Sequence, residues 1–172
     1  MSDKIFSYPG TSLSEKDIQD GKVLSIHDQM RGEFSWDTGV AIGKYLAGLK
    51  QGIIIGSYCT NCRRTVVPPR TVCEWCFHPM DRYAKLEDTG TVNTFSLCYV
   101  TWDVRRIKEP EIPAVIEIDG ASPLHGIMHK LGEVNPEDIK TGMRVQAVWK
   151  SPEERQGSIT DILYFRPLAE RQ

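Results

Sequence analysis

The sequence has no excess of positive charge, and this absence bears on the partners it can bind. Its 172 residues carry 21 lysines and arginines against 23 aspartates and glutamates, which gives a formal net charge of -2 at pH 7. Proteins that hold nucleic acid through its phosphates usually carry a basic excess. The composition therefore argues against nucleic acid as the main partner.

Long apolar runs and a secretion signal are also missing. The longest apolar run, residues 52–56, is far shorter than the roughly 18 to 20 residues that span a bilayer. The N-terminal residues 1–10 lack the charged start and apolar run of a signal peptide. Five cysteines without a secretion signal point to a reducing compartment, where paired cysteines more often hold metal than form disulfides. We therefore expect a cytoplasmic protein with no membrane partner.

Four of the five cysteines form two Cys-x-x-Cys pairs. Cys59 and Cys62 make the first pair, Cys73 and Cys76 make the second, and ten residues separate the pairs. Each pair can turn two sulfurs toward one ion, so that two turns complete a tetrahedron. The pattern is typical of a zinc ribbon and predicts one structural Zn²⁺, because four protein ligands leave no position for water or substrate. Iron is the alternative metal, since it also suits four thiolates.

Other uses of the cysteines fit the pattern less well. A dithiol redox centre needs only one Cys-x-x-Cys pair, and disulfides conflict with the expected compartment. His78 follows Cys76 by two residues and could replace a ligand, but four cysteines already suffice. Cys98 lies within a predicted β-run and is interpreted as a small apolar residue.

The hydrophobic pattern divides the chain into four parts. Residues 1–36 are polar and are expected to form an N-terminal extension that docks on a partner. Residues 37–52 show the i, i+3, i+4, i+7 apolar spacing of an amphipathic helix. This helix either packs on its own domain or uses its glycines to let another surface approach. Residues 53–80 hold the zinc ribbon, and residues 81–168 form the next domain.

Five β-runs follow in that last domain, with a short helical turn between the third and the fourth. Asn135, Pro136 and Gly142 are placed to cap, begin and end this turn. The order is that of an OB-fold, a small Greek-key barrel. The predicted fold class is mainly β with N-terminal helices, a rubredoxin-like zinc ribbon and then a five-stranded OB-fold barrel. The β-runs are residues 91–100, 114–118, 126–131, 145–149 and 159–165.

Six short segments accompany the succession of helix, ribbon and barrel. They are residues 43–52, 55–59, 68–70 with 73–76, 118–120, 141–145 and 164–167. Together they resemble a family of thiolase-associated zinc-ribbon and OB-fold proteins, long labelled a domain of unknown function, over residues from about 36 to 167. Arg63 is a departure, because the family more often has glycine in that turn.

The resemblance implies an accessory subunit rather than a stand-alone enzyme. Family members associate with thiolase-fold proteins, including acetoacetyl-CoA and hydroxymethylglutaryl-CoA enzymes of archaea. Some bacterial relatives accompany thiolases of aromatic-compound breakdown, such as benzoylsuccinyl-CoA thiolase. Barrel and ribbon then help shape the channel for coenzyme A, while the nucleophilic cysteine belongs to the partner. We expect a hetero-oligomer with a thiolase-fold protein, acyl-CoA as shared ligand, and no catalytic residue in this chain.

Coenzyme A carries phosphates, and arginine suits charge-assisted contacts to phosphate. Arg105, Arg106 and Lys108 are predicted in the loop after the first barrel strand. Each cation can equally be a solvated surface charge, and a tryptophan can equally fill the small core. The candidates in the ribbon are Arg63, Arg64, Arg70 and Trp75.

Two other functions remain open. OB-folds often bind single-stranded nucleic acid, which needs a basic groove with stacking aromatics. Phe95 and Tyr99 are predicted on one face of a strand, but their neighbours are mostly neutral. Catalysis by this chain alone needs an acid–base pair, and the titratable residues are scattered. His125 and His129 flank a predicted barrel strand, where we expect a surface or core role.

Overall fold

The computed structural model describes residues 14–23, 32 and 34–168. The chain forms two compact units, residues 1–36 and residues 37–172, and each is described here by itself. Most of the extension that is predicted to dock on a partner lies outside the described residues, so its role stays a prediction.

Helix α1 in the first unit spans Glu15–Gln19 and begins at a capping box. The Ser14 hydroxyl accepts a hydrogen bond from the Asp17 N–H at 3.3 Å, and the Asp17 carboxylate accepts one from the Ser14 N–H at 3.2 Å. These reciprocal bonds satisfy donors that the start of a helix leaves free. Hydrogen bonds from the Ser14 side chain and backbone lower the pKa of Asp17.

Helix α2, Gly39–Lys50, packs on its own unit, as the first interpretation of its pattern predicted. Tyr45 and Leu49 lie four residues apart on one side of the helix and are 3% and 0% exposed. A Cβ atom at Gly48 would lie 2.7 Å from Ile55 Cδ1, so this glycine lets the following strand approach closely. Within the described residues, no helix is long and apolar enough to cross a membrane.

Three antiparallel strands make the sheet of the ribbon, in the order β2-β1-β3. β1 spans Ile54–Cys59, β2 spans Arg64–Val66 and β3 spans Arg82–Leu86. The central strand β1 pairs with both neighbours and runs directly into the first cysteine turn. β3 has no counterpart among the predicted strands.

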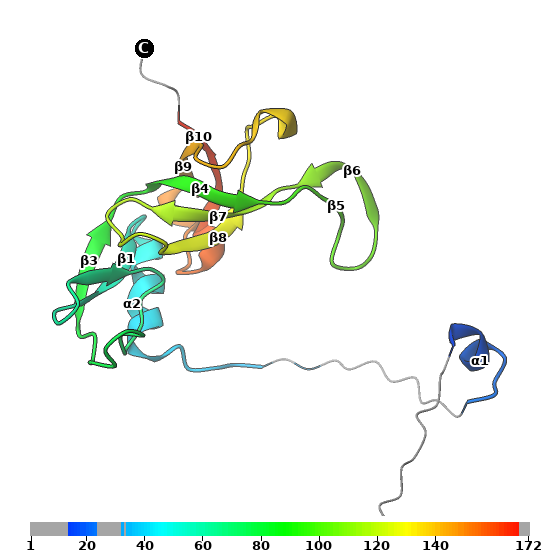
Figure 1. The fold of residues 1–172 in the computed structure, drawn as a ribbon, viewed down its shortest axis with the longest axis horizontal. Helices are drawn as coiled ribbons and strands as arrows, with labels where there is room; N and C mark the ends of the chain where they lie inside the picture. The colour runs from blue at the N-terminus through cyan, green and yellow to red at the C-terminus, as the bar shows by residue number, and fades with distance from the viewer. Residues whose placement is uncertain (1–13, 24–31, 33, 169–172) are drawn as a thin grey trace, which may run out of the picture. The chain divides into compact units, whose positions relative to one another are not determined.

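Five strands form the barrel, in the order β10-β9-β4-β7-β8 (Figure 1). Leu131, directly after β8, forms a parallel bridge to Phe165 of β10, and this bridge closes the barrel. The predicted turn between β8 and β9 is a 3-10 helix, η1, at Pro136–Asp138. Ribbon and barrel together confirm the predicted fold class. The strands are β4 Thr89–Phe95, β7 Pro113–Ile118, β8 Gly126–Lys130, β9 Arg144–Trp149 and β10 Ile162–Pro167, with 3-10 turns η2 Pro152–Glu154 and η3 Ile159–Asp161 before β10.

The prediction of one continuous strand over residues 91–100 is wrong. β5, Cys98–Val100, leaves the barrel and pairs with β6, Arg106–Glu111, in a separate two-stranded sheet. The last ladder bond to the barrel joins the Ser96 N–H to the Pro113 carbonyl oxygen at 3.0 Å. Pro113 begins β7 and has no N–H to donate, so the ladder is interrupted there and resumes at Cys98 and Glu111, where β5 pairs with β6. The β5–β6 hairpin therefore projects from the barrel (Figure 1).

Two further predictions are corrected by this hairpin. Phe95 and Tyr99 lie on different strands, β4 and β5, and do not share a strand face. Arg106 and Lys108 lie in β6 and not in a loop, whereas Arg105 directly precedes the strand.

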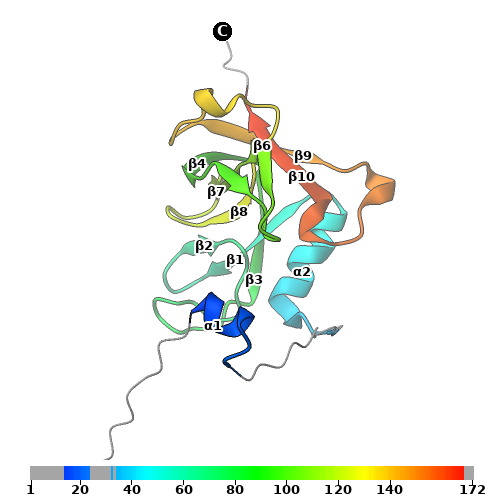
Figure 2. The ribbon, with the colours of Figure 1, turned by 90° about the vertical axis from the view of Figure 1, so that its right-hand side faces the viewer.

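One apolar core joins α2, the ribbon and the barrel. Leu49 of α2, Ile54 of β1 and Phe165 of β10 are all buried members of the same cluster. Figure 2 shows α2 alongside β1, and it also contacts η3, the turn before β10. The helix therefore fixes the ribbon against the barrel through shared apolar burial.

Leu49→Ala tests the role of α2 in this core. The truncation leaves a cavity between α2 and the barrel and should lower the free energy of unfolding by about 2 to 5 kcal/mol. Chemical denaturation measures it. Val40→Ala is the control, because Val40 is an exposed residue of the same helix and should cost no more than about 0.5 kcal/mol. Equal stability of the two variants would contradict the shared core.

Candidate metal centre and its surroundings

The first cysteine turn connects β1 to β2. Cys59 ends β1, and its register partner on β2 is Arg64. The Cys62 N–H donates to the Cys59 sulfur, with 3.4 Å between N and Sγ, as backbone amides do around metal-bound sulfur. Arg63 has a φ of +55°, a conformation that glycine adopts without steric cost. The turn keeps this left-handed geometry although arginine stands where the family more often has glycine.

The second cysteine turn shares the left-handed residue of the first. The Phe77 N–H donates to the Cys73 carbonyl oxygen at 2.9 Å, and Phe77 has a φ of +57°. In both turns, then, the residue after the second cysteine is left-handed. His78 is not part of the sulfur cluster, and its Nδ1 lies 3.1 Å from the Cys76 carbonyl oxygen.

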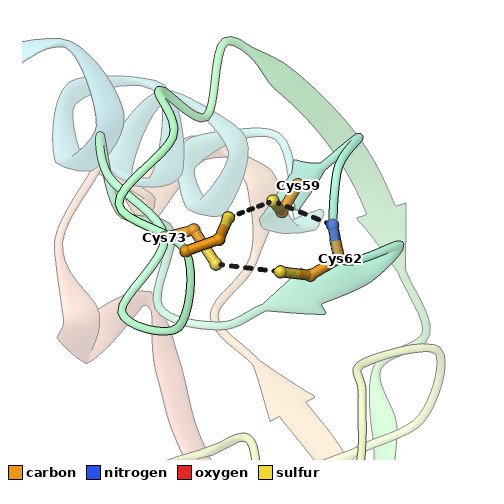
Figure 3. A group of neighbouring side chains, drawn as sticks. Cys59, Cys62 and Cys73 are labelled. Carbon is orange, nitrogen blue, oxygen red and sulfur yellow. Dashed lines mark hydrogen bonds between the residues drawn. The ribbon is translucent and has the colours of Figure 1, made fainter.

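The four cysteine sulfurs converge between the two turns and lie within 4.8 Å of one another. Figure 3 shows Cys59, Cys62 and Cys73 pointing toward a common centre. The sulfurs of Cys59 and Cys76 are 3.6 Å apart, and those of Cys62 and Cys73 are 4.0 Å apart. A tetrahedral ion with Zn–S bonds of about 2.3 Å sets its sulfurs about 3.8 Å apart. The cluster is consistent with a structural Zn²⁺.

Because the four thiols lie so close together, the pKa values of two of them shift in opposite directions. The pKa of Cys62 is raised, mainly by a hydrogen bond with the Cys76 side chain. The pKa of Cys76 is lowered, mainly by a hydrogen bond with the Asn61 side chain. A divalent cation removes this conflict, because it binds all four groups as thiolates. All five cysteines are free of disulfides, and Cys98 lies half-buried on β5, outside the cluster.

Three nitrogen-bearing side chains lie around the carboxylate of Glu74, which is inside the second cysteine turn. Its carboxylate oxygens lie 3.5 Å from nitrogens of Arg64, Arg70 and His125. His125 belongs to the β7–β8 connection of the barrel, and its Nε2 is 2.7 Å from Arg64 Nη2. Glu74 therefore ties the ribbon to the barrel. Sequence reasoning missed it, and its only local signal is the position between two predicted ligands.

Two of the ribbon candidates for coenzyme A contact pack on each other. The Arg64 guanidinium lies 3.8 Å from the centre of the Trp75 ring, a cation–π contact. The Arg64 side chain is only 17% exposed, so its contacts are internal to the protein. Arg63 and Arg70 are exposed, although Arg70 also pairs with Glu74.

The remaining candidates lie together on the β5–β6 hairpin. Arg105, Arg106 and Lys108 are all exposed, and Arg105 Nε lies 2.7 Å from Asp103 Oδ2. The structure thus divides the predicted phosphate contacts into a ribbon set and a hairpin set. A hollow of about 470 Å³ lies at the hairpin root, lined among others by Cys98 and Lys130.

The free energy of unfolding should fall as the pH drops from about 7.5 to 5.5. Burial is the main cause that lowers the pKa of both His125 and His129. The unfolded chain, with histidine pKa values near 6.5, then binds more protons than the folded chain. The histidine contribution is therefore complete above that pH and is lost below it.

Chemical denaturation at several pH values, with Zn²⁺ in excess, measures this loss. In the double variant His125→Gln and His129→Gln, stability should depend less steeply on pH over the same range. A slope equal to that of the wild type would show that neither histidine is responsible.

Comparisons with known proteins match both halves of this architecture. Residues 46–79 match the rubredoxin-like zinc ribbon domain of ChsH2, and residues 83–150 match the C-terminal OB-fold domain of ChsH2. The chain is 30% identical over 118 residues to a DUF35 domain-containing scaffold protein of Methanocaldococcus jannaschii. That match covers 67% of this chain and 82% of the relative.

Two solved structures are similar in fold. A DUF35 family protein of unknown function from Sulfolobus solfataricus has a TM-score of 0.55 and 26% identity, over 64% of this chain and 79% of that protein. The Ltp2–ChsH2(DUF35) aldolase has a TM-score of 0.56 and 20% identity, over 80% of this chain and 98% of the matched chain. These matches confirm the resemblance seen in the sequence. The chain belongs to the DUF35/ChsH2 family, whose members join a rubredoxin-like zinc ribbon to an OB-fold domain.

Proposed function

We propose that this chain is a non-catalytic subunit of a thiolase-type acyl-CoA enzyme complex, which stabilises its partner and helps form the coenzyme A channel. The scaffold protein of Methanocaldococcus jannaschii, 30% identical over most of its length, is the observation that supports this most directly. The Ltp2–ChsH2(DUF35) aldolase adds a fold-level parallel in which a DUF35 protein forms part of an enzyme. The partner then determines the acyl substrate. Thiolases of aromatic-compound breakdown are one candidate for this partner.

In this proposal the ribbon holds one structural Zn²⁺ per chain. The ligands are Cys59, Cys62, Cys73 and Cys76, whose sulfurs have the spacing of a tetrahedral site. The ion has no open position for a substrate, so its role is to hold the two cysteine turns together. Metal binding supplies folding energy that so small a module lacks.

Coenzyme A would meet the exposed cations of this subunit at the channel mouth. Arg105, Arg106 and Lys108 on the hairpin have free surface for its phosphates, and Arg63 and Arg70 have it on the ribbon. Arg64 is better placed to position Trp75 than to bind a phosphate, because its guanidinium is already engaged. Trp75 keeps an exposed ring that can stack on adenine.

Replacing one ligand should release the metal and loosen the ribbon. Cys73→Ala is expected to lose the Zn²⁺, measured by elemental analysis, and to speed hydrogen exchange over residues 59–76. Cys98→Ala is the matched control, because Cys98 lies outside the cluster, and it should keep one Zn²⁺ per chain. Unchanged exchange in Cys73→Ala would contradict the structural role of the metal.

Purification of the tagged wild-type protein from its source tests the proposed function. We expect a thiolase-fold protein in a fixed stoichiometric ratio, identified by mass spectrometry and retained in high salt. The competing hypothesis predicts a free protein that binds single-stranded oligonucleotides with steep salt dependence. Recovery in that form would overturn the accessory-subunit proposal.

A further inference from the structure

The barrel is closed by few backbone contacts at the seam between β8 and β10. Leu131 forms a parallel bridge to Phe165, and the Gly132 N–H donates to the Phe165 carbonyl oxygen at 2.9 Å. In the described part of the chain, the ladder of β8 is otherwise with β7 and that of β10 with β9. A closure with so few backbone bonds depends on the side chains that cross the seam.

His129 of β8 crosses this seam with its imidazole ring. The ring packs edge-on against Phe165 of β10, with 5.8 Å between the ring centres and 64° between the ring planes. Its Nε2 lies 3.4 Å from the carbonyl oxygen of Ile159 in η3, the turn before β10. Because a carbonyl oxygen only accepts hydrogen bonds, this contact requires a hydrogen on Nε2.

The other ring nitrogen of His129 favours the neutral form of the ring. Nδ1 is buried and has no hydrogen-bond partner within the described residues. Protonation would place an unpaired N–H and a positive charge at this buried atom, and both are unfavourable. Burial is the main cause that lowers the pKa of His129, and it outweighs the carbonyl groups of Ile159, Lys130 and Ile162, which act in the opposite direction. The closed seam therefore holds a neutral ring.

The charged groups around His129 offer no free carboxylate to a protonated ring. Lys130, its neighbour on β8, lowers its pKa further, and Lys150 lines the same surface hollow. The buried Asp161 of η3 accepts hydrogen bonds from the N–H groups of residues 156–158 at 2.7 to 3.1 Å. Burial raises the pKa of Asp161, but these bonds outweigh it, so the net shift is downward and the carboxylate stays ionised. The other titratable side chains of β7, β9 and β10 are bound elsewhere: Glu117 to Asn93, Arg144 to Asp119, and Tyr164 and Arg166 to Glu133.

A surface hollow beside His129 gives a charged ring a place to move. The hollow has a volume of about 490 Å³, and its walls include Met128, His129 and Leu163. Met128 is 71% exposed, so water reaches this wall. An imidazolium ring turned into the hollow is solvated, but it then no longer contacts Phe165 or Ile159.

We propose that His129 is a pH-sensitive latch of the barrel. Its neutral ring holds β8 against η3 and β10, and transfer of one proton from solvent to Nδ1 releases the ring and opens the seam. Opening exposes the facing edges of β8 and β10, so acidification changes the surface that this chain offers to other molecules. The proposal concerns the free chain and does not rest on the proposed function.

Hydrogen exchange followed by NMR tests the latch in the full chain with Zn²⁺ in excess. The protection factor of the Gly132 amide, corrected for the intrinsic pH dependence of exchange, is compared at pH values of about 7.5 and 5.5. It should fall several-fold and by at most about tenfold, because at the lower pH a released histidine with a pKa near 6.5 is about ten times more often protonated than neutral. The Val92 amide of the same barrel, which donates to the Met143 carbonyl oxygen at 2.9 Å, should lose less protection.

Two variants separate the latch from general acid sensitivity. His129→Gln keeps an uncharged donor on β8, and its Gly132 protection should change by less than about twofold between the two pH values. His125→Gln is the matched control and should keep the wild-type dependence, because His125 contacts Arg64 and Glu74 instead. An equal fall at Gly132 and Val92 in the wild type, or wild-type pH dependence in His129→Gln, would overturn the latch.

The wild-type ring gives a second test that does not require a variant to fold. The nitrogen NMR shifts of His129 should show the Nε2–H tautomer at neutral pH, and protonation of the ring should coincide with the loss of Gly132 protection. An Nδ1–H tautomer, or protonation with unchanged Gly132 protection, would contradict the proposal.

Discussion

The ribbon depends on four sulfurs that must be held together. Its own buried cluster consists of Cys59, Val66, Cys73 and Met80, so half of its members are cysteines of the candidate metal centre. A module with so little apolar surface does not fold on the hydrophobic effect alone. Zinc binding at this centre would supply the missing free energy. The residue after each cysteine pair, Arg63 or Phe77, has a positive φ, so both turns place their cysteines on a similar backbone.

Two kinds of contact hold the barrel against the ribbon. Apolar burial joins Leu49 and Ile54 to the barrel core. Polar contacts join Glu74 of the second cysteine turn to His125 of the barrel. Glu74 directly follows Cys73 of the cluster, so the sulfur cluster and the barrel are joined through neighbouring residues of one turn. These contacts hold the ribbon and the barrel as one body, as the proposed accessory role requires.

Local patterns in the sequence were enough for most of the fold. The cysteine spacing, the helical period before it and the turn signals around Asn135 each depend on neighbours within a few residues. The β5–β6 hairpin could not be predicted in this way, because residues 91–100 contain no glycine or proline and the break is imposed by Pro113 on another strand. For the same reason the partners of Arg64 were not foreseen, since His125 lies 61 residues away along the chain.

We propose that this chain organises a reaction carried out on another chain. Acyl-CoA turnover by the separated and the recombined subunits measures this division most directly. We expect no turnover by this subunit alone, and turnover by the recombined complex that exceeds that of the partner alone. Turnover of acyl-CoA by the isolated subunit would contradict it.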